Sequence, residues 1–172
     1  MSSLPLVSIP RLSLHGHHLL KRGTRFMEPD VIRCQENGGM IVMKDYGRYR
    51  ASPWAWLAAW LVRRERRFLT LASAEGISPA PLSSRDPLLL VMEWVDGRVP
   101  AQGDEPLLEQ AVRHLSRMKA LGVAHNDVHL SNVMVAGSRV VLLDWASAVQ
   151  EAWWLPSRIF QELHDRDQAH VT

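Results

Sequence analysis

One stretch, VAHNDVHLSNVMVAGSRVVLLDW at residues 123–145, restricts what this chain can fold into more than any other. Residues 132–135 and 140–143 read as two short strands, and Ala-Gly-Ser between them supplies a turn. A hairpin of this kind brings the start of its first strand close to the end of its second. Asp127 and Asn132 lie before or at the start of the first strand, and Asp144 follows the second. We therefore expect these three side chains to meet at one edge of the hairpin.

Two carboxylates and an amide at one edge favour a particular chemistry. Carboxylate and amide oxygens are ligands of Mg²⁺, and Mg²⁺ in turn holds phosphate groups. A remaining carboxylate can accept the proton of a hydroxyl nucleophile. The stretch therefore indicates magnesium-assisted phosphate chemistry. A metal-dependent hydrolase built on Asp127, Asn132, Asp144 and His129 is an alternative interpretation of the same residues.

A second polar pair is predicted in the first half of the chain. Lys44 follows the apolar run Met40–Met43, so it extends from a buried strand, where an ammonium group needs a partner or a ligand. The alternative is a strand-end lysine that reaches water. Ser52-Pro53 begins a helix that is expected to run to about Ala72. The spacing of its apolar residues places Glu65 in the inward stripe, which makes Glu65 the predicted partner of Lys44; the apolar positions are Trp54, Leu57, Ala58, Leu61, Phe68, Leu69 and Ala72.

The other patterns are those of ordinary strands, turns and helices. A small antiparallel sheet is expected within residues 23–46, with an Asn-Gly-Gly hairpin turn before its last strand. The N-terminal residues 1–22 are expected to be irregular, and residues 164–172 are expected to fray. The predicted elements are strands at 25–27, 31–35, 40–44 and 88–92, a helix from 104 that stops at Gly122, and a helix at 153–163 with Pro156 in its first turn.

The motif residues resemble those of the protein-kinase-like superfamily. His125-Asn126-Asp127 followed by Asn132 is similar to the catalytic loop H-x-D-x-x-x-x-N, and Asp144-Trp145-Ala146 stands where protein kinases have Asp-Phe-Gly. His129 and Trp145 differ from the residues usual in eukaryotic protein kinases. In both positions the chain looks more like the aminoglycoside phosphotransferase, RIO-like and lipopolysaccharide (Kdo/WaaP) kinase branches.

The resemblance implies an α+β fold with two lobes and a set of site roles. After an irregular segment at 1–22, an N-lobe at 23–95 would carry the small antiparallel sheet, and a shortened helical C-lobe would occupy 96–172. By the resemblance, Asp127 would receive the proton of the acceptor hydroxyl. Lys44, held by Glu65, would contact the α- and β-phosphates of ATP. The implied magnesium ligands are Asn132 and Asp144.

The segment from Met92 to Gly97 resembles a kinase hinge, because an apolar strand leads into Met-Glu-aromatic-Val and then Asp-Gly. The resemblance implies that the backbone of Glu93 and Val95 binds adenine, that Met92 backs the adenine pocket, and that Asp96 faces the ribose. One departure concerns the phosphates. The chain has no glycine-rich phosphate loop and offers Glu28-Pro29-Asp30 between the first two predicted strands.

The function implied is ATP- and Mg²⁺-dependent transfer of the γ-phosphoryl group to a hydroxyl. The acceptor could be a saccharide, a lipid-linked sugar, as in the lipopolysaccharide kinases, or a protein Ser/Thr. The alternative is a non-catalytic pseudokinase or interaction module, which the absent glycine-rich loop and the short C-terminal part suggest. Against it, all five polar site residues are intact, and a scaffold has no physical need for them.

Composition and charge restrict the partners and the location. The net charge of +2 is too small to propose nucleic acid as the main partner. Trp54, Trp56 and Trp60 precede a basic run, and this combination suits peripheral contact with a membrane. A core-facing helix with some exposed tryptophans is the alternative. A single cysteine, Cys34, and the lack of a signal-peptide pattern favour a cytoplasmic protein, with the inner face of the membrane as a further expected site of contact.

Overall fold

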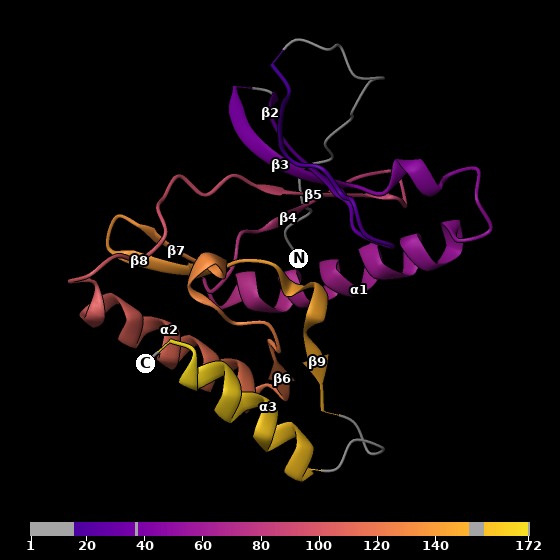
Figure 1. Ribbon diagram of the computed structural model, residues 1–172. Helices are drawn as coiled ribbons and strands as arrows, with labels where there is room; N and C mark the ends of the chain where they lie inside the picture. Colours follow the sequence, from indigo (N-terminus) through magenta and orange to yellow (C-terminus); the bar gives the residue numbers. More distant parts are fainter. Residues whose placement is uncertain (1–15, 37, 152–156, 172) are drawn as a thin grey trace. The chain divides into compact units, whose positions relative to one another are not determined.

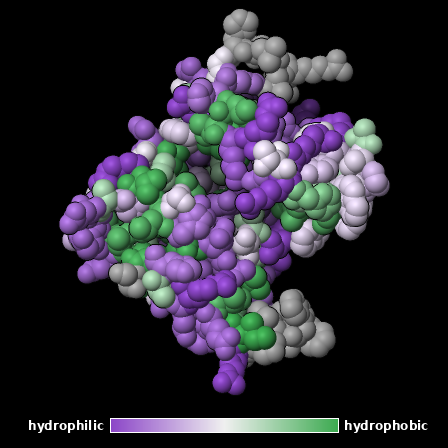
Figure 2. All heavy atoms as spheres, in the orientation of Figure 1, coloured by the Kyte–Doolittle hydropathy of each residue, from purple (hydrophilic) through white to green (hydrophobic). Residues whose placement is uncertain are grey.

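The computed structural model describes residues 16–36, 38–151 and 157–171 (Figure 1). They form two compact units of mixed α and β structure, as predicted. The first unit contains the described residues up to Thr70 together with Ala80–Trp94, and the second contains Leu71–Pro79 and the described residues from Val95 onward. The lobe boundary that the sequence places after residue 95 stays a prediction. On the face shown in Figure 2, hydrophobic residues are interspersed among hydrophilic ones. None of the described helices combines the length and the apolar character needed to span a membrane.

The first unit contains an antiparallel five-stranded sheet with the strand order β1-β2-β3-β5-β4. The β2–β3 hairpin confirms the predicted turn, because Glu36 pairs with Gly39 across two intervening residues. The second of these, Gly38, has a φ of +81°, a conformation that favours glycine. The strands are β1 (His18–Lys21), β2 (Asp30–Glu36), β3 (Gly39–Asp45), β4 (Pro81–Leu82) and β5 (Leu89–Glu93).

Two predictions for the N-terminal part of this sheet are wrong. Residues 18–21 belong to strand β1 and not to an irregular segment, and residues 25–27 form a turn and not a strand. The cause of the turn is the carboxylate of Glu28, which accepts hydrogen bonds from the backbone N–H groups of Thr24 (2.9 Å) and Arg25 (3.0 Å). Met27 adopts a left-handed φ of 58°, which ends any extended run there. Strand β4 was not among the predicted strands.

Strand β3 directs its side chains alternately to the two faces of the sheet. Ile41 and Met43 are buried in a cluster with Cys34 of β2 and Val91 of β5. Lys44, one residue farther along, points to the opposite face. Lys44 lies in the middle of a three-strand ladder and only 9% of it is exposed. The alternation of side chains explains how it is buried without entering the apolar cluster.

Helix α1 (Ala55–Ala74) follows a short 3₁₀ turn, η1 (Gly47–Tyr49). Glu65 lies in its buried face, as predicted. The set of residues predicted to face inward is wrong in part. Trp54 was included but is 46% exposed, and Val62 was not included but is buried. The guanidinium of Arg66, the residue after Glu65, donates to the carbonyl of Leu89 at 3.2 Å. The buried face has the 3–4 spacing of an amphipathic helix and consists of Ala58, Val62, Glu65, Phe68, Leu69 and Ala72.

The second unit is built from helices and two small antiparallel ladders. Helix α2 (Glu105–Ala120) buries Ala111, Leu115 and Met118 and ends before Gly122, whose φ of +70° fits the predicted stop. Strand β6 pairs with β9, and β7 pairs with β8 in the hairpin that the sequence predicts. The remaining bounds are β6 (Val123–Ala124), η2 (Leu130–Asn132), β7 (Val133–Ala136), β8 (Arg139–Leu142), η3 (Trp145–Ser147), β9 (Val149–Gln150) and α3 (Ser157–Ala169).

Helix α3 is longer than the sequence suggested. Its predicted beginning at residues 153–156 lies outside the described residues, and the predicted end at Leu163 is wrong because the helix continues to Ala169. Residues 164–172 were expected to fray, but His164, Asp167 and Val171 are buried, and they follow the buried Phe160 at spacings of four, three and four residues. Helix α3 lies beside α2 (Figure 1), with the amide of Gln168 donating to Ser116 Oγ at 3.1 Å.

Candidate active site

The polar pair predicted in the first unit is present. Lys44 Nζ lies 2.6 Å from Glu65 Oε1, and the two side chains are only 11% and 3% exposed. The lysine comes from β3 and the glutamate from the inward face of α1. An ammonium group fixed in this way by a buried carboxylate is a pre-oriented cation, which is suited to contact an anionic ligand.

The hinge-like residues are divided between the two units. In the first unit Met92 is 7% exposed and pairs with Val42 of β3. The backbone N–H of Glu93 donates to the carbonyl of Ala80 at 3.0 Å, so the amide proton of Glu93 is engaged inside the sheet. The adenine contact expected of Glu93 would therefore use its carbonyl oxygen.

In the second unit the hinge-like segment is attached to the hairpin. Val95 is half-buried, Asp96 is exposed, and Arg98 pairs with Val135 of β7 by backbone hydrogen bonds of 3.0 and 2.8 Å. Gly97 is required for this close approach, because a Cβ atom there would lie 2.7 Å from the carbonyl oxygen of Val135. The segment that carries the predicted ribose-facing Asp96 is thus fixed to the strand that follows Asn132.

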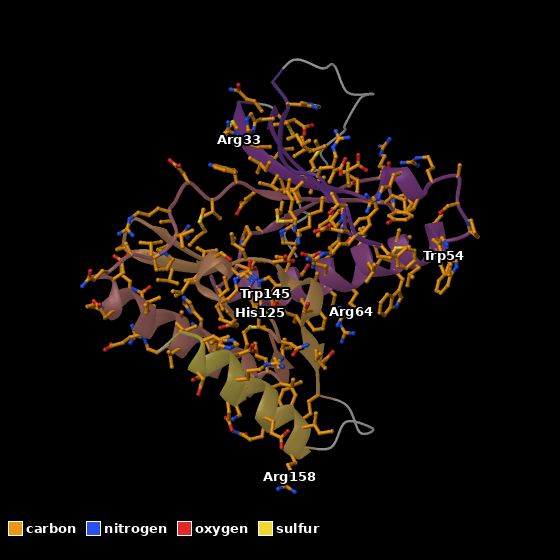
Figure 3. All side chains as sticks on the ribbon, viewed as in Figure 1. Arg33, Trp54, Arg64, His125, Trp145 and Arg158 are labelled. Carbon is orange, nitrogen blue, oxygen red and sulfur yellow. The ribbon has the colours of Figure 1, made fainter. Side chains whose placement is uncertain are left out.

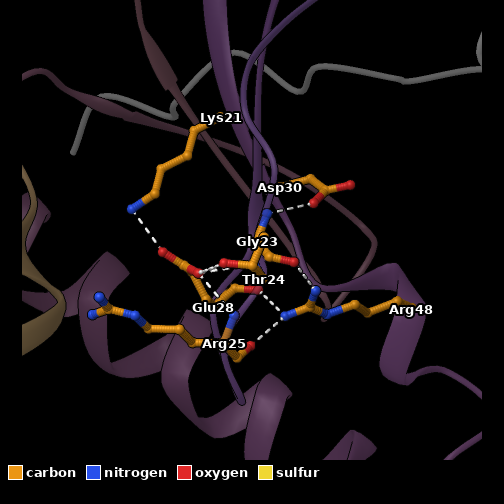
Figure 4. A network of polar contacts seen from close by, with 7 residues as sticks. All are labelled: Lys21, Gly23, Thr24, Arg25, Glu28, Asp30 and Arg48. Atoms are coloured by element: carbon orange, nitrogen blue, oxygen red, sulfur yellow. Dashed lines mark hydrogen bonds and ion pairs between the residues drawn. The ribbon is translucent and has the colours of Figure 1, made fainter.

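The loop between β1 and β2, Arg22–Pro29, is stabilised by a carboxylate of the loop itself (Figure 4). Besides the N–H groups of Thr24 and Arg25, Glu28 contacts the ammonium of Lys21 at 2.7 Å. The hydrogen bond from Lys21 is the main cause that lowers the pKa of Glu28 to about 2, and the backbone donors add to it. Two backbone N–H groups and an ammonium thus converge on one anionic group, which is how protein loops commonly hold anions.

Arg48 fixes the same loop from its other side. Its guanidinium donates to the carbonyl of Arg25 at 2.8 Å and also to the carbonyls of Gly23 and Glu28. Gly23 admits no side chain, because a Cβ atom would lie 2.2 Å from the carbonyl oxygen of Glu28. Although it has no glycine-rich phosphate motif, the chain has a compact loop between its first two strands.

In the second unit the hairpin joins the two motif segments, as the sequence predicts. The backbone N–H of Leu143 donates to the carbonyl of Asn132 at 2.8 Å, which places Asn132 directly beside the residue that precedes Asp144. Asp144 has a left-handed backbone with φ of 56° and ψ of 72°. A non-glycine residue in this conformation is strained, and such strain is concentrated at functional sites.

Asn132 is oriented by its neighbours in the loop. Its amide Nδ2 lies 3.0 Å from the carbonyl oxygen of Asp127 and 3.0 Å from His129 Nε2. Because the amide nitrogen donates in both contacts, His129 carries its ring proton on Nδ1, which lies 2.6 Å from Ser131 Oγ. The amide oxygen of Asn132 is therefore the atom that would contact a cation. The side chain of Asp127 belongs to an exposed residue, which makes it accessible to a reactant.

His125 has a packing role beneath this loop and is 1% exposed. Its Nε2 lies 2.9 Å from the carbonyl oxygen of Leu143, and its ring meets that of Trp145 edge-on at 4.5 Å between centroids (Figure 3). Burial is the main cause that lowers the pKa of His125, so the ring stays neutral near pH 7. The residues flanking Asp144 are thus bound to the segment that carries Asp127.

Asp167 is a site residue that sequence reasoning missed. Its carboxylate accepts hydrogen bonds from the backbone N–H groups of Asn126 (2.8 Å) and Val128 (3.4 Å), the two neighbours of Asp127. Arg166 and His170, also from the end of α3 or just beyond it, contact the same two residues; His170 Nδ1 lies 2.9 Å from the carbonyl oxygen of Val128. The signal was present in the sequence, because Asp167 continues the spacing that begins at Phe160.

The residues present fit a magnesium ion that also contacts a phosphate. No cluster of three or more His, Cys, Asp or Glu side chains that could hold a metal occurs in the part of the chain that the structure describes. Mg²⁺ is usually bound by one or two carboxylates together with the phosphates of the substrate, and does not need an all-protein cage. One carboxylate, Asp144, and one amide oxygen, Asn132, match that requirement.

The family model described as "RIO domain" matches residues 41–163. A relative from Methanosarcina barkeri, named "Probable bifunctional tRNA threonylcarbamoyladenosine biosynthesis protein", is 29% identical over 87 residues, which cover 50% of this chain and 16% of the relative.

Among solved structures, the Rio2 kinase of Chaetomium thermophilum in a complex described as ADP/Mg²⁺-phosphoaspartate has a TM-score of 0.67 at 20% identity. This match covers 89% of this chain and 53% of that one. A second structure of the same kinase gives a TM-score of 0.66 at 18% identity, covering 89% and 56%. The chain thus spans little more than half of the matched structures and a sixth of the sequence relative, and the structural matches show the fold alone.

Proposed function

We propose that this chain, which belongs to the RIO domain family of the protein-kinase-like superfamily, is an ATP-dependent phosphotransferase. The activity proposed is transfer of the γ-phosphoryl group to a hydroxyl acceptor. The family match supports ATP-dependent phosphotransfer in general, and the site residues support specific roles.

In the first unit, the ammonium of Lys44 would contact the phosphates, and Glu65 would hold it in place. Met92 would line the adenine site, and the backbone of Glu93 and Val95 would bind the base. Because the positive charge of Lys44 is fixed before the reaction, it can stabilise negative charge on the phosphates without further reorganisation.

In the second unit, the amide oxygen of Asn132 and the carboxylate of Asp144 would hold Mg²⁺. The ion would neutralise charge on the transferring group. Asp127 would orient the acceptor hydroxyl and take its proton at a carboxylate oxygen. Asp96 would contact the ribose.

The buried Lys44–Glu65 pair is the observation that carries the proposal. A buried ion pair is a poor way to stabilise a fold, since apolar residues of similar volume often serve equally well or better. A pair held at 2.6 Å in a nearly dry setting is therefore better explained by function than by stability.

The proposal is tested by phosphoryl transfer from γ-labelled ATP with Mg²⁺. The acceptors are saccharides, lipid-linked sugars and generic proteins, and they distinguish the three acceptor classes. We expect Asp127→Asn to lower the transfer rate by roughly 10²- to 10⁴-fold. Asp165→Asn, which changes an exposed acid on α3, is the matched control and should leave the rate unchanged. Transfer that is equal in wild type and Asp127→Asn would contradict the proposal.

The pseudokinase or interaction module remains the second candidate function. The observation in its favour is the loop between β1 and β2, where Glu28 already occupies N–H groups that could otherwise meet a phosphate. Thermal unfolding with and without Mg²⁺-ATP separates the two. A rise in Tm with the nucleotide supports the enzyme, and an unchanged Tm supports the module.

A further inference from the structure

The outward face of helix α1 carries an ordered set of aromatic and basic side chains. Trp56, Trp60, Arg63 and Arg67 follow one another at spacings of four, three and four residues, which places them on one line along the helix. Trp56 is 66% exposed, Trp60 is 48% exposed, and both arginines are exposed. The line runs roughly 16 Å, at a rise of about 1.5 Å per residue, on the side opposite the buried face.

Two further exposed rings contact each other near the beginning of α1. Trp54 is 46% exposed and Phe26 is 64% exposed, and their rings meet edge-on at 5.3 Å between centroids. Figure 3 shows Trp54 at the beginning of α1 and Arg64 farther along the same helix. The aromatic–arginine face is defined here as Trp56, Trp60, Arg63 and Arg67.

The charge of α1 is strongly asymmetric. The helix contains four arginines and a single acid, Glu65, and that acid is turned inward to Lys44. Arg63 and Arg67 lie on the outward side of α1, which therefore carries positive charge.

We propose that the aromatic–arginine face docks this protein on an anionic phospholipid surface. Tryptophan rings are favoured at the boundary between headgroups and acyl chains, because one part of the ring is apolar and the indole N–H is polar. Arginines along the same line would meet the phosphate groups of anionic lipids. A bilayer offers both environments side by side along the full length of the line. The proposal does not rest on the proposed kinase activity, and it would bring the chain to the inner face of a membrane.

The test measures binding of the full chain to vesicles. The vesicles contain phosphatidylcholine alone or phosphatidylcholine mixed with phosphatidylglycerol, and binding is followed by co-sedimentation and by the tryptophan emission maximum. We expect binding to the mixed vesicles only, with a blue shift of the emission. The double variant Arg63→Gln/Arg67→Gln should bind roughly 30-fold more weakly. Trp56→Ser/Trp60→Ser should bind about tenfold more weakly, because two half-exposed rings lose their burial in lipid.

The matched control is Arg113→Gln/Arg117→Gln, which removes the same charge from α2 and should bind as wild type does. Circular dichroism checks that every variant is folded. We expect all of them to fold, because the substituted side chains are exposed. The proposal is overturned by equal binding to neutral and mixed vesicles, by no binding to either, or by unchanged binding of the tryptophan variant. Self-association that the tryptophan substitutions abolish, in the absence of vesicle binding, would assign the face to a second copy of the chain instead.

Discussion

Replacing Lys44 and Glu65 singly and together tests whether the buried ion pair exists for function. Lys44→Met or Glu65→Met removes one charge and leaves the other buried without its 2.6 Å partner. The double variant removes both charges and fills the space with apolar side chains. Each single variant should therefore be less stable than the double variant.

The magnitude follows from burial. At 11% and 3% exposure the pair belongs with buried ion pairs, for which loss of one partner costs about 3–5 kcal/mol, and not with surface pairs at about 0–1 kcal/mol. Replacing both partners by apolar residues is often neutral or stabilising. We therefore expect the double variant to recover most of the loss, with a coupling energy of several kcal/mol.

The assay is urea unfolding of wild type, both single variants and the double variant. The same cycle on Arg113 and Glu109, which are 64% and 74% exposed, is the control and should give a coupling of about 0.5 kcal/mol or less. If the effects of Lys44→Met and Glu65→Met add to within about 0.5 kcal/mol, the two groups do not interact and the reasoning is refuted. Nucleotide affinity should be lost in all three variants, including the stable double variant.

Three further predictions concern the loops and three histidines. Asp167→Asn should lower the free energy of unfolding by about 2 kcal/mol and slow phosphoryl transfer, because two backbone N–H groups beside Asp127 lose a charged acceptor; unchanged transfer would show that the loop holds its own shape. NMR titration should find the Glu28 carboxyl with a pKa of about 2, so its stabilising contribution is present above the ordinary value of 4.5 and disappears as the pH falls through about 2; a pKa near 4.5 would refute the observed loop. Stability should fall as the pH drops below about 6.5, because burial lowers the pKa of three histidines and the unfolded chain then binds more protons; a flat urea midpoint between pH 7 and pH 5 would contradict this for His114, His125 and His164.

Patterns that depend on local periodicity could be read from the sequence. The 3–4 spacing in α1 identified Glu65 as inward, the apolar run of β3 identified Lys44 as buried, and their contact followed because each needed the other. The hairpin at 133–142 brought Asn132 beside Leu143 for the same kind of reason, since two apolar runs separated by Ala-Gly-Ser have few other ways to pair.

Features that depend on a contact made by one particular side chain could not be predicted from the sequence. The turn at residues 25–27 exists because the carboxylate of Glu28 bonds back to the loop, and no periodicity reports such a bond. Asp167 supports a loop about 40 residues earlier in the chain, and the charged appearance of residues 164–172 concealed its burial. Trp54 was assigned to the inward stripe because it fits the spacing of the apolar residues, but its side chain is 46% exposed.

The central claim is that this chain binds a magnesium–nucleotide complex, with Lys44 proposed to contact the phosphates and Asp144 proposed to hold the ion. The dissociation constant of ATP tests this claim most directly. The constant is measured for wild type, Lys44→Met and Asp144→Asn, each with Mg²⁺ and with a chelator. We predict that wild type binds Mg²⁺-ATP, that each substitution weakens this binding at least about tenfold, and that the effect of Asp144→Asn disappears when the chelator removes the ion. Absence of binding by wild type, or equal constants for all three proteins, would contradict the account.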